Sequence, residues 1–199
     1  LSGQERGEID ISATASSGPG WVQVKGSAWV TTDGLSSDLR LTGEDFQLID
    51  LPEARVHISP AMNLALSGDK ISVQGEVKVP SARIKLKSLP ESSVRVSPDQ
   101  VIVQGQDDET TATPDTRRID ASLRLILGED VRFEGLGLKA KLAGNLLLTE
   151  QPGQLTTASG SINLTEGTYK AYGQNLTIER GRLLYAGGLV TEPGLDVRA

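Results

Sequence analysis

The chain has 199 residues, a formal net charge of −6, no cysteine and one histidine, and aromatic residues make up only 4% of it. The lack of cysteine excludes disulfides, thiolate metal sites and cysteine nucleophiles. The 20 Lys and Arg residues are spread along the chain, which argues against a basic surface for nucleic acid. No run of about 18 apolar residues occurs, so the sequence predicts no membrane-spanning helix.

Alternation of apolar and polar residues recurs along most of the chain. In Glu8–Thr14, for example, Ile9 and Ile11 alternate with Asp10 and Ser12. This period of two is typical of β-strands with one apolar and one polar face, and no stretch has the period of an amphipathic helix. The segments predicted as strands, in chain order, are Glu8–Thr14, Trp21–Thr32, Leu35–Leu41, Phe46–Leu51, Ala54–Ile58, Met62–Leu66, Lys70–Val79, Ala82–Leu86, Val94–Val96, Val101–Val103, Ile119–Leu127, Leu136–Leu148, Gly160–Tyr172, Gln174–Ala186 and Leu195–Ala199.

From these fifteen candidate segments we expect about twelve to fourteen short strands, and the short connections between most of them favour antiparallel pairing. Pro80 is expected to end one strand, because proline lacks the amide hydrogen that a sheet needs. Gly26 is expected to mark a bulge or bend. Between 104 and 116 no large apolar residue occurs, which predicts a flexible insertion. A domain boundary there is the alternative, but the same kind of strand resumes at Ile119, so residues 1–199 are interpreted as one β-domain.

One face of the predicted sheet is aliphatic and almost free of aromatic residues. Such a face can be hidden in a sandwich, a closed barrel, a solenoid, or a sheet bent into a trough. A smooth aliphatic wall suits an acyl chain, because each buried methylene contributes about 0.8 kcal/mol. The alternative is that these side chains pack against one another, and the pattern leaves both open. The sixteen residues predicted to line a groove are Ile71, Val73, Val77, Val79, Ile84, Leu86, Ile119, Leu123, Leu125, Leu127, Leu138, Leu142, Leu146, Leu148, Ile162 and Leu164.

Residues that commonly carry catalysis or bind metals are sparse. His57 is the single histidine, and it is expected to be a surface residue because it lies on the polar side of a predicted strand. A metal site built on histidines is therefore not expected. Counting alone does not exclude a Ser-His-Asp triad, but the Gly-x-Ser-x-Gly elbow of such enzymes does not occur. The acidic cluster Asp107–Glu109 is interpreted as solvated loop charge, and we predict no enzymatic activity, no cofactor and no metal ion.

Two stretches carry a family resemblance. The first contains Gly-x-Tyr-x-Ala-Tyr-Gly-Gln from Gly167, Gly-x-Leu-x-Tyr from Gly181, and Pro-x-Leu-Asp from Pro193. The second runs from Gly75 to Ile84 and continues at Val96–Val103. Together they resemble the C-terminal domain of the TamB family, the inner-membrane-anchored subunit of the translocation and assembly module.

The resemblance implies a mostly antiparallel sheet bent into a taco or half-pipe with an aliphatic interior groove. It implies a periplasmic segment of a protein anchored in the Gram-negative inner membrane. The implied partners are phospholipid acyl chains, outer-membrane protein substrates, and a TamA-like Omp85 protein that binds through a C-terminal part beyond Ala199. Because the sequence starts without Met and stops in mid-alternation, it is expected to be a fragment of a longer protein. Glu192 departs from the family, in which asparagine is expected before Pro193.

Three functions are compatible with these observations. The main hypothesis is a lipid conduit, in which phospholipid moves between the two membranes along the groove and outer-membrane protein assembly is supported. The second is a chaperone-like module that holds nascent outer-membrane β-strands by strand addition. The third is a structural β-solenoid stalk, for which a strict repeat period is missing.

Overall fold

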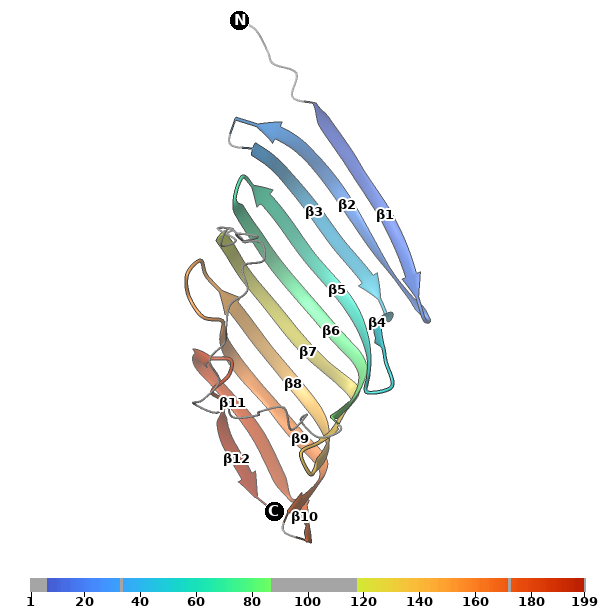
Figure 1. The fold of residues 1–199 in the computed structure, drawn as a ribbon, viewed down its shortest axis with the longest axis vertical. Coiled ribbons are helices and arrows are strands. Elements are labelled where there is room, and N and C mark those ends of the chain that lie inside the picture. The colour runs from blue at the N-terminus through green and yellow to red at the C-terminus, as the bar shows by residue number, and fades with distance from the viewer. Residues whose placement is uncertain (1–6, 33, 87–117, 172, 199) are drawn as a thin grey trace, which may run out of the picture.

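The computed structural model describes residues 7–32, 34–86, 118–171 and 173–198. All strands in these ranges belong to one open, mostly antiparallel sheet (Figure 1), which confirms the all-β prediction. The predicted strands Val94–Val96 and Val101–Val103 and the predicted insertion at 104–116 lie outside the described residues. The twelve described strands are β1 (Glu8–Ser17), β2 (Gly20–Thr31), β3 (Gly34–Glu44), β4 (Phe46–Asp50), β5 (Ala54–Ser67), β6 (Lys70–Leu86), β7 (Arg118–Gly135), β8 (Leu138–Glu150), β9 (Thr157–Ala171), β10 (Gln174–Ile178), β11 (Arg180–Leu189) and β12 (Gly194–Arg198).

Strand order follows the chain almost throughout. The order is β1-β2-β3-β5-β6-β7-β8-β9-β11-β12, with β4 paired to β5 and β10 paired to β9. Among the described pairs only β6 and β7 are parallel, from Lys70 beside Arg118 to Leu86 beside Gly135. Parallel strands need a connection that returns along the sheet, and residues 87–117 separate these two strands in the sequence. The sequence predicted a mostly antiparallel sheet, which the described pairs confirm. Alternation is the same in parallel and antiparallel strands, so it did not reveal the direction of this pair.

Two strands run through prolines. β5 contains Pro60 and β6 contains Pro80. On one side of β5, the pairing with β3 stops at Ala61 and the pairing with β4 starts at Ile58. Pro60 lies in the gap between the two pairings, so its lack of an amide hydrogen breaks no hydrogen bond on that side. Pro80 falls at a register shift between β6 and β7. The prediction that Pro80 ends a strand is therefore wrong, because proline is tolerated where the ladder is interrupted.

Gly26 does not mark a bulge. It pairs in regular register with Ile11 of β1 and Leu39 of β3. Its φ of 154° is a value that L side chains rarely adopt, and a Cβ atom there would overlap the backbone oxygen of Asp38. The glycine therefore lets β2 and β3 approach closely within an unbroken ladder.

The sheet bends along a line that crosses its central strands, which is consistent with the bent shape that the family resemblance implies. The pairs β5–β6, β6–β7 and β7–β8 all shift register beside one row of directly paired residues, which consists of Val56, Ala82, Val131 and Leu142. Bulges of this kind bend a strand and increase its twist. The buried cluster of Val79, Ala82 and Val131 lies at this bend. The partly buried side chains that pack against it are Val56, Ile58, Leu125, Leu127 and Leu142.

Replacing Val131 with Ala is expected to lower the free energy of unfolding by about 2 kcal/mol, because it removes two buried carbons and leaves a cavity. Val131 is only 3% exposed. Urea unfolding of the purified chain measures the difference. The control is Val30→Ala, at a side chain that is 71% exposed, where a change below about 0.5 kcal/mol is expected. Equal losses in the two variants would contradict a core at the bend.

Candidate functional site

The register places the sixteen predicted groove residues on one face of the sheet. Directly paired residues point to the same face. Ile71 pairs with Ile119 and Val77 with Leu125 across the parallel seam, and Leu125 pairs in turn with Leu146 of β8. The remaining members of the set follow from the pairs Val73–Ala121, Val79–Leu127, Ile84–Phe133, Leu86–Gly135, Gly135–Leu138, Leu123–Leu148, Leu142–Leu164 and Gly144–Ile162.

The same face continues beyond the predicted residues on both sides. Leu39 of β3 pairs with Leu64 of β5, which pairs with Val73. At the other end, Leu183 of β11 pairs with Leu195 of β12. The prediction was limited to the strands between Lys70 and Leu164, although the alternation that identifies the flanking residues is equally clear in the sequence. We call this continuous surface the apolar face and the opposite surface the polar face.

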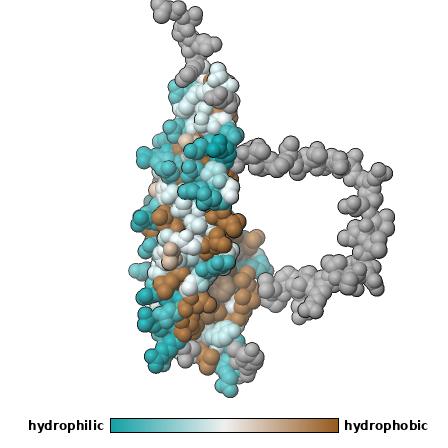
Figure 2. All heavy atoms as spheres, turned by 90° about the vertical axis from the view of Figure 1, so that its left-hand side faces the viewer, coloured by the Kyte–Doolittle hydropathy of each residue, from teal (hydrophilic) through white to brown (hydrophobic). Residues whose placement is uncertain are grey.

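The apolar face is incompletely covered in the described part of the chain. Ile9 is 67% exposed and Leu195 is 71% exposed, near the two ends of the sheet. At the centre Leu146 and Leu164 are buried, whereas Leu123 and Leu148 are half-buried. Figure 2 views the sheet from its side and shows, in the lower half of the molecule, apolar side chains gathered toward one side and polar side chains along the other. Since all described strands belong to the same sheet, no second layer from these residues packs over the apolar face.

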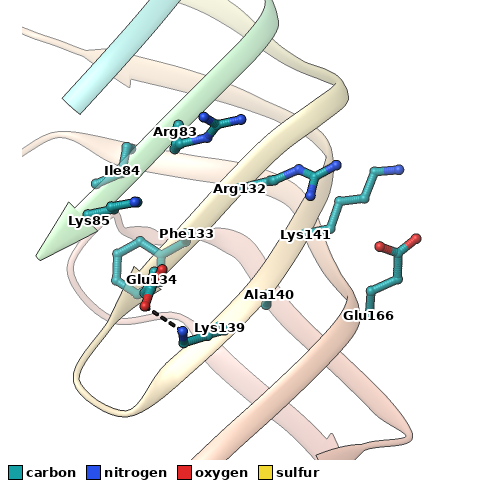
Figure 3. Close-up of a pocket in the computed structure, with 10 residues that line it drawn as sticks. All are labelled: Arg83, Ile84, Lys85, Arg132, Phe133, Glu134, Lys139, Ala140, Lys141 and Glu166. Atoms are coloured by element: carbon teal, nitrogen blue, oxygen red, sulfur yellow. Dashed lines mark ion pairs between the residues drawn. The ribbon is translucent and has the colours of Figure 1, made fainter. Parts of the chain in front are cut away.

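A pocket lies at the ends of β6, β7 and β8, and sequence reasoning missed it. Its volume is ≈ 330 Å³ (Figure 3). Its charged residues come from the polar face, in two cross-strand rows. Arg83, Arg132 and Lys141 form one row of directly paired residues. The other row consists of Lys85, Glu134 and Lys139. The ten lining residues are Arg83, Ile84, Lys85, Arg132, Phe133, Glu134, Lys139, Ala140, Lys141 and Glu166.

The fold therefore gathers basic residues that are spread along the sequence. Five cations and two carboxylates line this pocket, in a chain whose net charge is negative. The signal was present as Lys and Arg on the polar positions of three predicted strands. It carried no information about clustering, because which strands are neighbours, and in which register, is not encoded in the alternation.

The cations of the pocket hold two carboxylates ionised: Glu134, which lines the pocket, and Asp130, which lies beside it. Asp130 accepts a hydrogen bond of 2.8 Å from Nε of Arg132, and this bond and the guanidinium charge hold the pKa of Asp130 below its ordinary value. The charges of Arg83 and Lys141 lower this pKa further. Nζ of Lys139 lies 2.6 Å from Oε1 of Glu134 and lowers the pKa of Glu134 in the same way.

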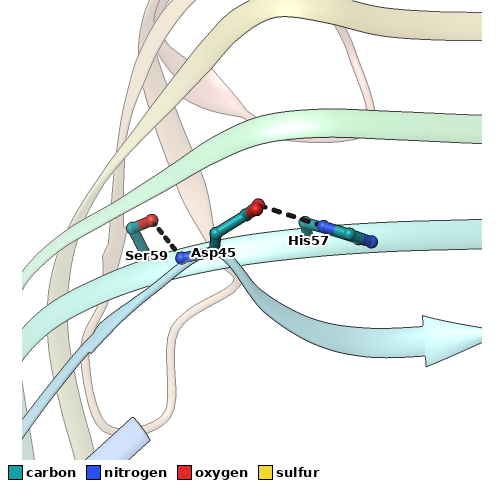
Figure 4. A network of polar contacts seen from close by, with 3 residues as sticks. All are labelled: Asp45, His57 and Ser59. Atoms are coloured by element: carbon teal, nitrogen blue, oxygen red, sulfur yellow. Dashed lines mark hydrogen bonds and ion pairs between the residues drawn. The ribbon is translucent and has the colours of Figure 1, made fainter. Parts of the chain in front are cut away.

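His57 is not the surface residue that the sequence predicts. Its side chain is on the polar face but only 15% exposed, and its Nδ1 lies 3.0 Å from Oδ1 of Asp45 (Figure 4). Asp45 sits at the bend between β3 and β4, with a φ of 45°. Its backbone N–H donates a hydrogen bond to Oγ of Ser59. The contacts of Asp45 with Ser59 and His57 therefore hold the bend between β3 and β4 against β5. In the described ranges, no group of three or more His, Cys, Asp or Glu side chains is placed to hold a metal ion.

Comparison with known proteins decides the family. Residues 10–199 match the family model described as TamB C-terminal domain. The chain belongs to the TamB family. The match confirms the resemblance and extends it to the strands before Gly75, which carry none of the motifs quoted above.

The chain is also 31% identical over 181 residues to the "Translocation and assembly module subunit TamB" of Haemophilus influenzae. That alignment covers 86% of this chain and 14% of the relative, so the chain spans about one seventh of the length of that TamB protein. Among the described residues of this TamB-family chain, no helix is long and apolar enough to cross a membrane.

Proposed function

We propose that this chain carries phospholipid acyl chains along its apolar face, as a periplasmic segment of a TamB-type subunit anchored in the inner membrane. In this proposal residues 1–199 act as one β-taco segment of a longer protein that moves phospholipid between the inner and outer membranes. The longer protein works with a TamA-like Omp85 partner and supports outer-membrane protein assembly. Membership of the TamB family supports the assignment to the translocation and assembly module. No catalytic role is part of the proposal.

The observation that carries the proposal is a continuous aliphatic face that no other described element covers. Its sixteen predicted residues share one side of a bent sheet, and several apolar side chains on that side remain exposed. A contiguous exposed apolar surface marks a binding site more often than a defect. An acyl chain of about fourteen methylenes laid on it would gain ~11 kcal/mol before the costs of ordering, at about 0.8 kcal/mol per methylene.

The direction of the path follows from the sheet. The apolar face crosses the strands from β1 to β12, and ten strands in line at about 4.8 Å spacing extend roughly 40 Å. The wall offers aliphatic side chains and few polar groups, so it holds a tail without fixing its position. Such a surface lets a lipid slide across successive strands while its headgroup stays in solvent.

A photo-crosslinking amino acid at Leu123 is expected to capture phospholipid in cells. The matched control is the same amino acid at Arg124, one position along β7, whose side chain points to the polar face. Mass spectrometry of the crosslinked chain identifies the adduct. Equal lipid capture at the two positions, or no capture at Leu123, would contradict the proposal.

Strand addition is a second candidate, and one observation favours it. In the described part of the sheet, β1 and β12 end the strand order and pair on one side only. A nascent outer-membrane strand can pair with such an edge through its backbone. Crosslinkers in β1 or β12 that capture substrate protein, with no lipid at Leu123, would favour this function. The mostly antiparallel order argues against a β-solenoid stalk, which stacks parallel coils.

A further inference from the structure

We propose that the pocket on the polar face binds a phosphate group carried by a small ester or by a lipid headgroup. This pocket opens on the opposite side of the sheet from the apolar face, so the inference does not rest on the proposed lipid path. The ligand is defined by its chemistry: a compact dianion or monoanion whose oxygens accept hydrogen bonds from guanidinium and ammonium groups.

The first argument is the row formed by Arg83, Arg132 and Lys141. Each is paired directly with the next across β6, β7 and β8, and like charges that face each other in a sheet destabilise it. Only Arg132 has its charge balanced at close range, by Asp130. Within the described part of the chain, Arg83 and Lys141 make no ion pair. A bound anion would relieve the repulsion along this row.

The second argument is the charge of the lining. Five cations face Glu134 and Glu166 in the pocket and Asp130 beside it, although acidic residues outnumber basic ones in the chain, 26 to 20. Figure 3 shows the Arg83, Arg132 and Lys141 side chains extending from neighbouring strands, with Glu166 beside Lys141. Glu134 is already paired with Lys139. The carboxylates present thus leave a net positive pocket on an acidic protein.

The third argument separates phosphate from other anions. Two of the cations are arginines, whose planar guanidinium presents two parallel N–H donors that match phosphate oxygens. The pocket volume of ≈ 330 Å³ is at the lower end for small-molecule sites, which suits a phosphate ester better than an extended acidic peptide. Exposed flexible side chains form its walls, so a headgroup can enter without a change in the sheet.

Titration of the purified chain with sn-glycerol 3-phosphate in low-salt buffer tests the proposal, with amide shifts followed by NMR. We expect saturable shifts at the ends of β6, β7 and β8 that weaken as salt is added. The variant R83Q/R132Q/K141Q should bind at least about tenfold more weakly, the factor expected from the loss of one charge-assisted hydrogen bond. The matched control is K25Q/R40Q/R124Q, which also replaces two arginines and one lysine, but elsewhere on the polar face. This control should bind glycerol phosphate as tightly as the unchanged chain does.

A variant that is expected to bind more tightly tests the proposal even if the triple variant is unstable. D130N frees the Arg132 guanidinium and is expected to tighten glycerol phosphate binding severalfold, while circular dichroism reports an unchanged fold. Dihexanoyl phosphatidylglycerol, used below its micelle concentration, distinguishes the two sources of phosphate. Tighter binding of this lipid assigns the site to a headgroup, and equal binding assigns it to a soluble ester; both results support a phosphate site.

Three results would overturn the proposal. The first is equal weakening in the pocket variant and in its matched control. The second is a set of shifts that lies away from the ends of β6, β7 and β8. The third is tight binding of a tetraglutamate peptide with no binding of glycerol phosphate, which would identify a site for acidic protein segments instead.

Discussion

The Leu123→Arg substitution is expected to lower the amount of phospholipid that stays bound after purification without detergent by about tenfold or more. Leu123 is half-buried in β7 and pairs with Gly75 and Leu148 on the apolar face. In the empty protein an arginine there reaches solvent, because no other described layer covers it. An acyl chain lying over it would have to desolvate the charge, which costs several kcal/mol. Native mass spectrometry counts the bound lipid.

The matched control for this variant is Leu184→Arg. Leu184 is 41% exposed and lies on the polar face of β11, paired with Ser161 and Gly194. The same change of side chain there should leave lipid content unaltered. Both variants should unfold in urea within about 1 kcal/mol of the unchanged chain. A similar loss of lipid in both would show that added charge, and not its position, is responsible.

Gly144→Val is expected to destabilise the chain by about 3 kcal/mol or more, enough to unfold much of a marginally stable domain. Gly144 stands in β8 between Leu127 and Ile162, with a φ of 144° that valine adopts only with strain. A Cβ atom there would overlap the backbone oxygen of Ser161. The ladder between β8 and β9 would therefore have to open beside the bend.

Gly188→Ala provides the comparison for Gly144→Val. No atom outside its chain neighbours lies within 4 Å of a Cβ atom built at Gly188, and its φ is not in the left-handed region. We expect a change below about 0.5 kcal/mol at this position. Urea unfolding curves of the two variants give the difference. A Gly144→Val chain as stable as Gly188→Ala would mean that β8 and β9 do not approach as closely as described.

Properties with a period of two could be predicted from the sequence. Alternation assigns each residue of a strand to one of two faces, so Leu123, Leu125 and Leu127 could be grouped before any partner strand was known. The same reasoning placed Leu146 and Leu164 with them, and the register agrees. Family resemblance added the bent shape, which alternation alone does not distinguish from a sandwich or a barrel.

Properties that depend on which strands are neighbours could not be predicted. The basic pocket exists because Arg83, Arg132 and Lys141 meet across three strands, and two of those strands are parallel. His57 is shielded by Asp45, a residue on a different strand connection. The strand end at Pro80 was predicted wrongly for the same reason, because whether a proline's missing amide hydrogen matters depends on the strand beside it.

The parallel seam between β6 and β7 has a consequence for how the protein folds. On either side of it the sheet consists of antiparallel hairpins between neighbouring segments, which close small loops at little entropic cost. The seam joins Lys70 to Arg118, 48 positions later. Closing this loop therefore has a larger entropic cost than closing one of the hairpins. The buried cluster draws Val79 and Ala82 from one side and Val131 from the other. Two half-sheets therefore gain their shared core only when they meet, which makes the seam the expected late and cooperative step of folding.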